Sequence, residues 1–244
     1  FSGNTEETLE AFEKAKAKNT EIACVSSGGK LIELAKAQNL NYIQLAPGDS
    51  PRAMMGYSIT QLLYILNHYG LISDGFKNKL NETASLIDEM QKEIQADAEK
   101  ITNHLFGKIP VIYACDGYKG MAVRFTQQLA ENSKMLSWHN IIPEMNHNEL
   151  VGWRTKNENL AVIFFRNETD HKRNQKRIEI NSEVVSKYTS SVMEYWSKGD
   201  SMIEKTFYLI NVCDHVSFNL SKRNNVIVEE IEVINHLKGE LAKF

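Results

Sequence analysis

The chain has 244 residues, 42% of them hydrophobic and 24% charged, with a formal net charge of −3. These values are typical of a globular protein with one large domain or two smaller ones, and the small charge gives no reason to expect nucleic acid or an acidic membrane as partner. No apolar run approaches the roughly 20 residues that span a bilayer. Cys24, Cys115 and Cys213 are far apart, each beside Ala or Val. They predict reduced core residues of a cytoplasmic protein.

The first stretch, Ser2-Gly3-Asn4-Thr5, precedes a helix expected from near Glu6. A glycine that allows close backbone approach, two hydroxyls and a helix N-terminus are typical of an anion-binding loop. By themselves, the same residues are more simply explained as an ordinary helix cap at Thr5. In an α/β unit a strand leads into such a loop. We therefore expect the first domain to be truncated at its N-terminus.

Short apolar runs then alternate with amphipathic segments: strands are expected at 21–26 and 42–45, and helices at 30–38 and 53–69. The nearly continuous apolar run at 21–26 is typical of a strand buried on both faces. Alternating strands and helices indicate a doubly wound parallel sheet. Residues 73–105 are mostly polar with helical spacing, which is typical of a helix that bridges two domains or packs along one edge.

A second unit of the same kind begins with a strand expected at 109–115, a glycine-containing turn and a helix through Leu129. Further strands are expected at 160–165 and 192–196, and helices at 201–222 and 231–241. The basic segment 166–177 predicts a solvated loop and helix start. The expected fold is α/β, with two doubly wound, flavodoxin-like three-layer αβα domains: residues 1–72, a linking helical segment 73–106, and residues 107–244.

Three polar residues after the linking segment are candidates for chemistry: Glu131, His147 and Lys238. Taken singly, each has a simpler explanation, as a surface carboxylate at a helix end, a hydrogen-bonded loop histidine and a surface lysine. The seven histidines form no HExxH motif and no Cys/His cluster, so no metal and no cofactor is expected. The sequence also has no nucleophile elbow and no P-loop.

Taken together, the motifs occur in an informative order. Ser-Gly-Asn-Thr-Glu-Glu-Thr is followed by Pro51-Arg52, Ala-Glu131-Asn-Ser-Lys, Pro143-Glu-Met-Asn-His-Asn-Glu and His236-Leu-Lys. This order resembles the bifunctional phosphoglucose/phosphomannose isomerase family, a branch of the phosphoglucose isomerase superfamily with two sugar isomerase (SIS) domains. The resemblance implies two SIS-type domains. It also implies a metal-free isomerase of glucose 6-phosphate, mannose 6-phosphate and fructose 6-phosphate that acts through an enediolate.

The resemblance assigns roles residue by residue. Ser2, Gly3, Asn4 and Thr5 would bind the substrate phosphate, Glu131 would move the proton between C1 and C2, and Arg52 would lie near the enediolate. Lys238 would assist ring opening, and His147 would do so from the neighbouring subunit of a homodimer. These residue types suit the chemistry, which needs a base, a fixed positive charge and a group that titrates near neutrality.

The sequence departs from the family's pattern at two points, and two alternative functions stay open. Residues 226–230, Val-Ile-Val-Glu-Glu, replace an expected Asp-Pro loop, which weakens the prediction for mannose 6-phosphate. Upstream residues, including another phosphate-binding serine, are expected but not in the chain. One alternative is a non-catalytic SIS regulator, which needs Ser2 and Thr5 but has no use for the base Glu131. The other is the isomerase half of an aminosugar-phosphate synthase.

Overall fold

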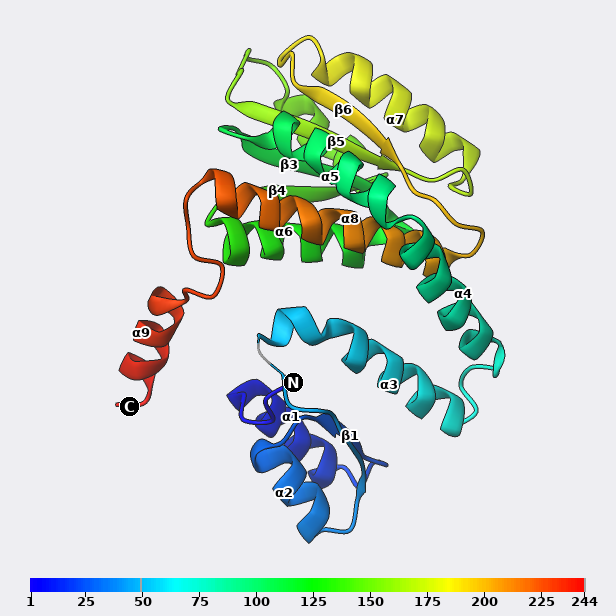
Figure 1. Cartoon of the computed structure of the whole chain (residues 1–244), viewed down its shortest axis with the longest axis vertical. Helices are drawn as coiled ribbons and strands as arrows, with labels where there is room; N and C mark the ends of the chain where they lie inside the picture. Colours follow the sequence, from blue (N-terminus) through cyan, green and yellow to red (C-terminus); the bar gives the residue numbers. More distant parts are fainter. Residues whose placement is uncertain (49, 244) are drawn as a thin grey trace. The chain divides into compact units, whose positions relative to one another are not determined.

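The computed structural model describes residues 1–48 and 50–243 and has an α/β fold with parallel strands. The chain divides into two compact units, residues 1–78 and 79–244, which we describe separately (Figure 1). The boundary falls inside the polar helical segment that the sequence predicts. Among the described residues, no helix combines the length and the apolar character needed to cross a membrane.

The first unit contains one small sheet. Its elements are α1 (Glu6–Ala17), β1 (Ala23–Ser26), α2 (Gly29–Ala37), β2 (Asn41–Gln44), η1 (Pro51–Met54) and α3 (Met55–His68). β1 and β2 are parallel, and the core beside them consists of Phe12, Cys24, Leu31 and Ala35. Within β1 only Cys24 and Ser26 are buried, so the prediction of a strand buried on both faces is wrong.

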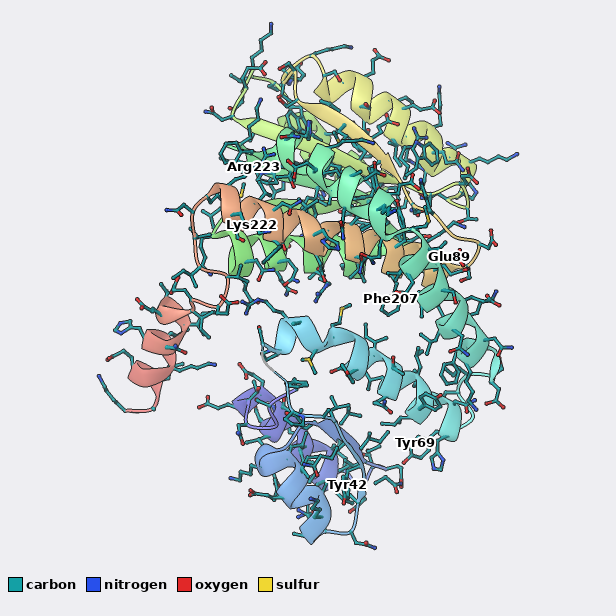
Figure 2. All side chains as sticks on the ribbon, viewed as in Figure 1. Tyr42, Tyr69, Glu89, Phe207, Lys222 and Arg223 are labelled. Carbon is teal, nitrogen blue, oxygen red and sulfur yellow. The ribbon has the colours of Figure 1, made fainter. Side chains whose placement is uncertain are left out.

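On the other side of this sheet lies a shallow pocket of about 300 Å³ between β2 and α3. Tyr42 and Tyr69 line it, and both are labelled in Figure 2. The Tyr69 hydroxyl donates to Glu21 Oε1 at 2.9 Å and accepts from Asn41 Nδ2 at 3.1 Å. These bonds join the end of α3 to the start of β2 and to the segment just before β1.

The polar segment forms two helices, α4 (Gly75–Glu89) and α5 (Gln91–Leu105). The apolar positions of α5 recur every three or four residues and are fully or almost fully buried: Ile94, Ala98, Ile101 and Leu105. α5 packs against α8 (Met202–Arg223). Thus α5 is part of the core of the second unit, although its outer face is polar enough to resemble a linking helix.

The second unit is built on four parallel strands in the order β4-β3-β5-β6. They are β3 (Ile109–Cys115), β4 (Trp138–Ile142), β5 (Leu160–Arg166) and β6 (Val192–Trp196). An open parallel sheet whose first strand lies inside is the doubly wound arrangement that the sequence predicts. β4 was not predicted. It is an edge strand, and only its last two residues, Ile141 and Ile142, are buried, so it lacks the continuous apolar run of its neighbours.

Helices cover both faces of this sheet (Figure 1). The other helical elements of this unit are η2 (Asp116–Tyr118), α6 (Lys119–Ser133), η3 (Glu144–His147), η4 (Glu149–Gly152), α7 (Lys172–Val185) and α9 (Glu232–Leu241). On one face, Val111, Tyr113 and Phe164 pack with residues of α7 and of the segment 144–153. Alternate side chains of the strands point to the other face, which α5, α6 and α8 cover. Phe165 of β5, for example, packs against Phe125 of α6.

Arg166 corrects one prediction. The sequence places it at the start of a solvated basic segment, but it is 6% exposed. Its Nη1 donates to Glu194 Oε2 at 2.6 Å, and its guanidinium lies 4.5 Å from the Trp196 ring centroid. The reason is register, because Arg166 ends β5 directly opposite Trp196 on β6. Only the tertiary pairing of the two strands supplies these partners.

The three cysteines are free and buried, as expected of core residues. Burial raises the pKa of all three thiols, that of Cys115 to about 12. A raised pKa keeps a cysteine as the unreactive thiol. None of the three is suited to nucleophilic chemistry.

Candidate active site

The Ser2–Thr5 loop lies directly against the turn that follows β1. Ser27 N donates to Phe1 O at 2.8 Å, and Leu31 N donates to Gly3 O at 3.0 Å. Gly3 has a φ of +76°, and a Cβ there would collide with the carbonyl oxygen of Gly28. This position therefore requires glycine for two reasons: its backbone angle and the close approach of the two loops.

Asn4 has a structural partner that the sequence did not indicate. Its Oδ1 accepts from Lys30 N at 2.9 Å. Lys30 is the second residue of α2, so Asn4 and the Gly3 carbonyl together satisfy amides that the start of α2 would otherwise leave unpaired. The loop is thus fixed to the N-terminus of the neighbouring helix.

Thr5 occupies the N-cap position of α1, yet its side chain makes no capping hydrogen bond. The amides of Thr8 and Leu9 bond instead to the Thr5 carbonyl, both at 3.1 Å. The Ser2 side chain is exposed, and its Oγ accepts only a long 3.4 Å bond from Asn4 N. The ordinary-cap explanation of Thr5 is therefore not what the structure shows. Both hydroxyls and the first amides of α1 can bond to an anion.

Two serines that the sequence analysis did not single out brace this loop. Ser26 Oγ donates to Phe1 O at 2.6 Å, and Ser27 Oγ donates to the same oxygen at 3.0 Å. A Ser-Ser-Gly-Gly run between a strand and a helix was the available signal. The sequence alone could not show that both side chains turn toward the backbone oxygen of Phe1, 25 and 26 residues away.

We expect Gly3→Ala to destabilise the first unit by on the order of 3 kcal/mol, because it adds a strained positive φ to a direct collision with Gly28. Thermal unfolding and titration with a phosphosugar would measure the loss of stability and of binding. Gly56→Ala in α3 is the matched control, since a Cβ there meets nothing within 4 Å. Equal, small effects of both substitutions would contradict the role given to Gly3.

Arg52 also lies in the first unit. It is the second residue of η1, directly before α3, and its side chain is half-buried. The structure therefore places the Ser2–Thr5 loop and Arg52 in one unit and the three remaining candidates in the other.

Glu131 lies in the last turn of α6, and the two residues after it hold that turn in place. Asn132 Nδ2 donates to Ser217 Oγ at 2.9 Å, and Ser133 Oγ donates to Ser217 O at 2.6 Å. Glu131 is half-buried on the rim of a pocket of about 430 Å³. The pocket is lined by Ala130, Glu131, Lys134, Met135, Leu136, Glu230, Ile231, Val233 and Ile234. A glutamate on an anchored helix end thus lines a hollow large enough for a small molecule.

Lys238 lies on α9, whose first turn forms the other wall of this pocket. It is exposed, and it follows Ile234, a pocket residue, by one helical turn. Residues four apart lie on one side of a helix. The fold of the second unit therefore brings the helix of Lys238 to the end of the helix of Glu131.

His147 ends η3 and is exposed, while its neighbours are tied down. Asn146 Nδ2 donates to Asn181 Oδ1 at 2.6 Å, and Asn148 Nδ2 donates to Glu144 Oε1 at 2.8 Å. Asn148 Oδ1 in turn accepts from Glu149 N at 2.6 Å. The segment therefore presents an imidazole at the surface from a well-bonded backbone.

Glu149 is a further residue that the sequence analysis did not single out. Its carboxylate accepts from Tyr113 Oη at 2.5 Å, Trp138 Nε1 at 2.9 Å and Asn140 Nδ2 at 2.5 Å. Burial, and then the Glu149 carboxylate, raise the pKa of Tyr113, so the hydroxyl stays a donor. Glu149 anchors the His147 segment to two strands.

Within one chain, the sheet separates His147 from Glu131. The 144–153 segment packs on the face covered by α7, whereas α6 packs on the opposite face with α8. The described residues around the Glu131 pocket include none from 144–149. Among the described residues, no group of three or more His, Cys, Asp or Glu side chains is placed to hold a metal ion.

Comparisons with known proteins identify the family of the chain. Residues 94–241 match the model of the bacterial phospho-glucose isomerase C-terminal SIS domain. A bifunctional phosphoglucose/phosphomannose isomerase from Caldicellulosiruptor bescii is 33% identical over 254 residues, covering 100% of this chain and 75% of that protein. A D-glucosamine-6-phosphate 4-epimerase from Sulfolobus acidocaldarius is 26% identical over 242 residues, covering 98% of this chain and 73% of that protein.

Solved structures with low sequence identity to this chain also share its fold. The C-terminal domain of glucosamine-fructose-6-phosphate aminotransferase from Francisella tularensis superposes with a TM-score of 0.73 at 14% identity, covering 94% of this chain and 71% of that one. At such low identity the likeness concerns the fold alone. The family model, and the match of the whole of this chain to three quarters of the Caldicellulosiruptor protein, show the family as well. The chain belongs to the bifunctional phosphoglucose/phosphomannose isomerase family.

Proposed function

We propose that this protein is an aldose–ketose isomerase that interconverts glucose 6-phosphate and mannose 6-phosphate with fructose 6-phosphate. The observation that carries the proposal is Glu131, a half-buried carboxylate on an anchored helix end at the rim of a pocket. A carboxylate in that setting can remove a proton from one carbon and return it to the next. Family membership fixes the class of reaction in which such a base is used.

Each remaining candidate is given a role that fits its surroundings. The Ser2 and Thr5 hydroxyls and the first amides of α1 bind the phosphate, which orients the sugar without taking part in the chemistry. Gly3 lets the backbone approach, and Asn4 holds the loop on α2. Arg52 stabilises the negative charge of the enediolate, since a fixed cation does so without reorganisation.

Ring opening needs a proton donor and acceptor at the sugar's ring oxygen and anomeric hydroxyl. Lys238 is assigned to this step because its helix borders the Glu131 pocket. His147 is assigned because an imidazole exchanges protons near neutrality and is exposed here. No metal or other cofactor enters the proposed reaction.

The position of His147 supports a homodimer. In one chain the sheet lies between α6 and the 144–153 segment, so His147 serves a Glu131 pocket only from a partner subunit. A two-fold dimer would supply both sites symmetrically. We also propose that the two compact units are the two SIS domains, with residues 1–72 and 107–244 as their main parts, and that the protein acts in the cytoplasm.

A phosphosugar-binding regulator is the second candidate. Its supporting observation is that the Ser2–Thr5 loop, with its braced glycine, lies in a different unit from Glu131 and His147. A regulator would bind the same ligands but would not exchange the proton on C2. Turnover therefore separates the two functions.

The deciding assay measures fructose 6-phosphate formed from glucose 6-phosphate and, separately, from mannose 6-phosphate, with EDTA present. We expect turnover of both hexose phosphates, because one enediolate serves both epimers at C2. Glucosamine 6-phosphate is included, since one relative is named for that sugar. Turnover of glucose 6-phosphate alone would limit the proposal to the glucose epimer, and binding without any turnover would favour the regulator.

A further inference from the structure

The ammonium group of Lys134 lies among three backbone carbonyls. Its Nζ donates to Glu131 O at 2.5 Å, Glu230 O at 2.7 Å and Val228 O at 3.3 Å. An ammonium has three N–H groups, so three carbonyl acceptors match its donors. The side chain thus joins the last turn of α6 to the segment that leads into α9.

The backbone of Lys134 is arranged for this contact. The residue caps α6 in the left-handed conformation, with φ +56°, and its N–H donates to Leu129 O. Glu131 O is one of the carbonyls that the end of a helix leaves without an intrahelical partner. A cation there also complements the negative end of the helix dipole. Lys134 therefore completes the helix end that carries Glu131 while it reaches across to another segment.

The segment that Lys134 contacts runs from the end of α8 to the start of α9. It begins after α8, where Asn224 Nδ2 donates to Ser133 O at 2.9 Å and where Arg223, labelled in Figure 2, pairs with Glu99 of α5. It continues into α9, of whose described residues none is buried; Val233 is 81% exposed and Leu237 57%. A helix with so little buried surface is placed mainly by the contacts of its connection.

We propose that Lys134 is a positioning residue that holds residues 226–231, and with them α9, against the end of the helix carrying Glu131. The inference rests on the proposed isomerase function. It predicts that loss of the Lys134 ammonium displaces Lys238 and the pocket wall relative to Glu131. The catalytic step is affected more than phosphate binding, because the phosphate loop belongs to the other unit.

The ammonium can be removed and restored at one atom. The described native cysteines are 2% to 4% exposed, so the thiol of a Lys134→Cys variant is the reactive one. Bromoethylamine converts that thiol to a lysine-like ammonium, whereas iodoacetamide gives a neutral side chain of similar length. Lys187→Cys, treated in the same two ways, is the control: Lys187 lies just after α7, is 60% exposed and pairs with Glu183 by an ordinary i,i+4 contact.

We expect Lys134→Cys to lower kcat for fructose 6-phosphate formation about 10- to 100-fold, with KM changed less than about threefold. Bromoethylamine should restore most of kcat and iodoacetamide none, while every Lys187→Cys form keeps the parent activity. Unchanged kcat in Lys134→Cys would overturn the proposal. So would a loss that both reagents repair equally, since it would trace to the free thiol.

Hydrogen exchange on the same samples tests the contact without relying on activity. Amides of residues 226–241 should exchange faster in Lys134→Cys and recover after bromoethylamine, while the interiors of α6 and α8 stay protected. Unchanged exchange of the amides of residues 226–241 would overturn the proposal that Lys134 holds this segment. If the unmodified protein lacked isomerase activity, the proposed function would fail, and the exchange result would still decide whether Lys134 holds the segment.

Discussion

Glu131→Gln is expected to lower kcat about 10²- to 10⁴-fold while phosphosugar binding is retained. Glutamine keeps the size of the side chain and its hydrogen-bonding oxygen but cannot accept the C2 proton at neutral pH. The anchoring bonds of Asn132 and Ser133 to Ser217 are untouched, so the helix end keeps its place. The effect is therefore confined to proton transfer.

Three readouts measure this. Steady-state kinetics give kcat, titration calorimetry with fructose 6-phosphate gives affinity, and NMR in D₂O follows deuterium entering the sugar at C1 or C2. Deuterium entry measures the proton-transfer step directly, and we expect its rate to fall as far as kcat does. Glu183→Gln, an equally conservative change at a 73%-exposed glutamate in α7, is the matched control and should leave all three unchanged. Lost affinity with intact turnover would remove Glu131 from the role of base.

Dimers that combine a Glu131→Gln subunit with a His147→Ala subunit are expected to recover activity that neither variant has alone. His147→Ala alone should lower kcat about 10²-fold or more, because ring opening loses its imidazole. If each site takes Glu131 from one subunit and His147 from the other, a dimer of Glu131→Gln with His147→Ala keeps one intact site and loses the other. Random assembly of equal amounts of the two variants should then give about one quarter of the activity of the unsubstituted protein.

The mixed species must be isolated for this test. Two different affinity tags allow sequential purification, and native mass spectrometry confirms the composition. An inactive, verified mixed dimer would show that both side chains act within one chain, against the separation of α6 and η3 by the sheet. A monomer with full activity would exclude a shared site altogether. His171→Ala, at the N-cap of α7, is a control for histidine loss elsewhere in the unit.

The sequence by itself determined the class of fold and most of its elements. Continuous apolar runs at 109–115 and 160–165 predict buried strands, because a strand covered on both faces has no polar, solvent-facing side. The start of α1 after the Ser2–Thr5 loop is equally local, since glycine, hydroxyls and a helix start act within a few residues of one another. The ordered motifs also indicated the family.

Only the tertiary structure decided the features whose partners are distant in the chain. Edge strand β4 has too little buried surface to leave an apolar pattern, and Arg166 is buried because β6 supplies Glu194 and Trp196. Glu149 and Lys134 are single polar residues in the sequence. Glu149 becomes an anchor for strands β3 and β4, and Lys134 joins α6 to carbonyls near residue 230. Hydrogen bonds between distant segments depend on how the chain folds, and no local pattern of residues records them.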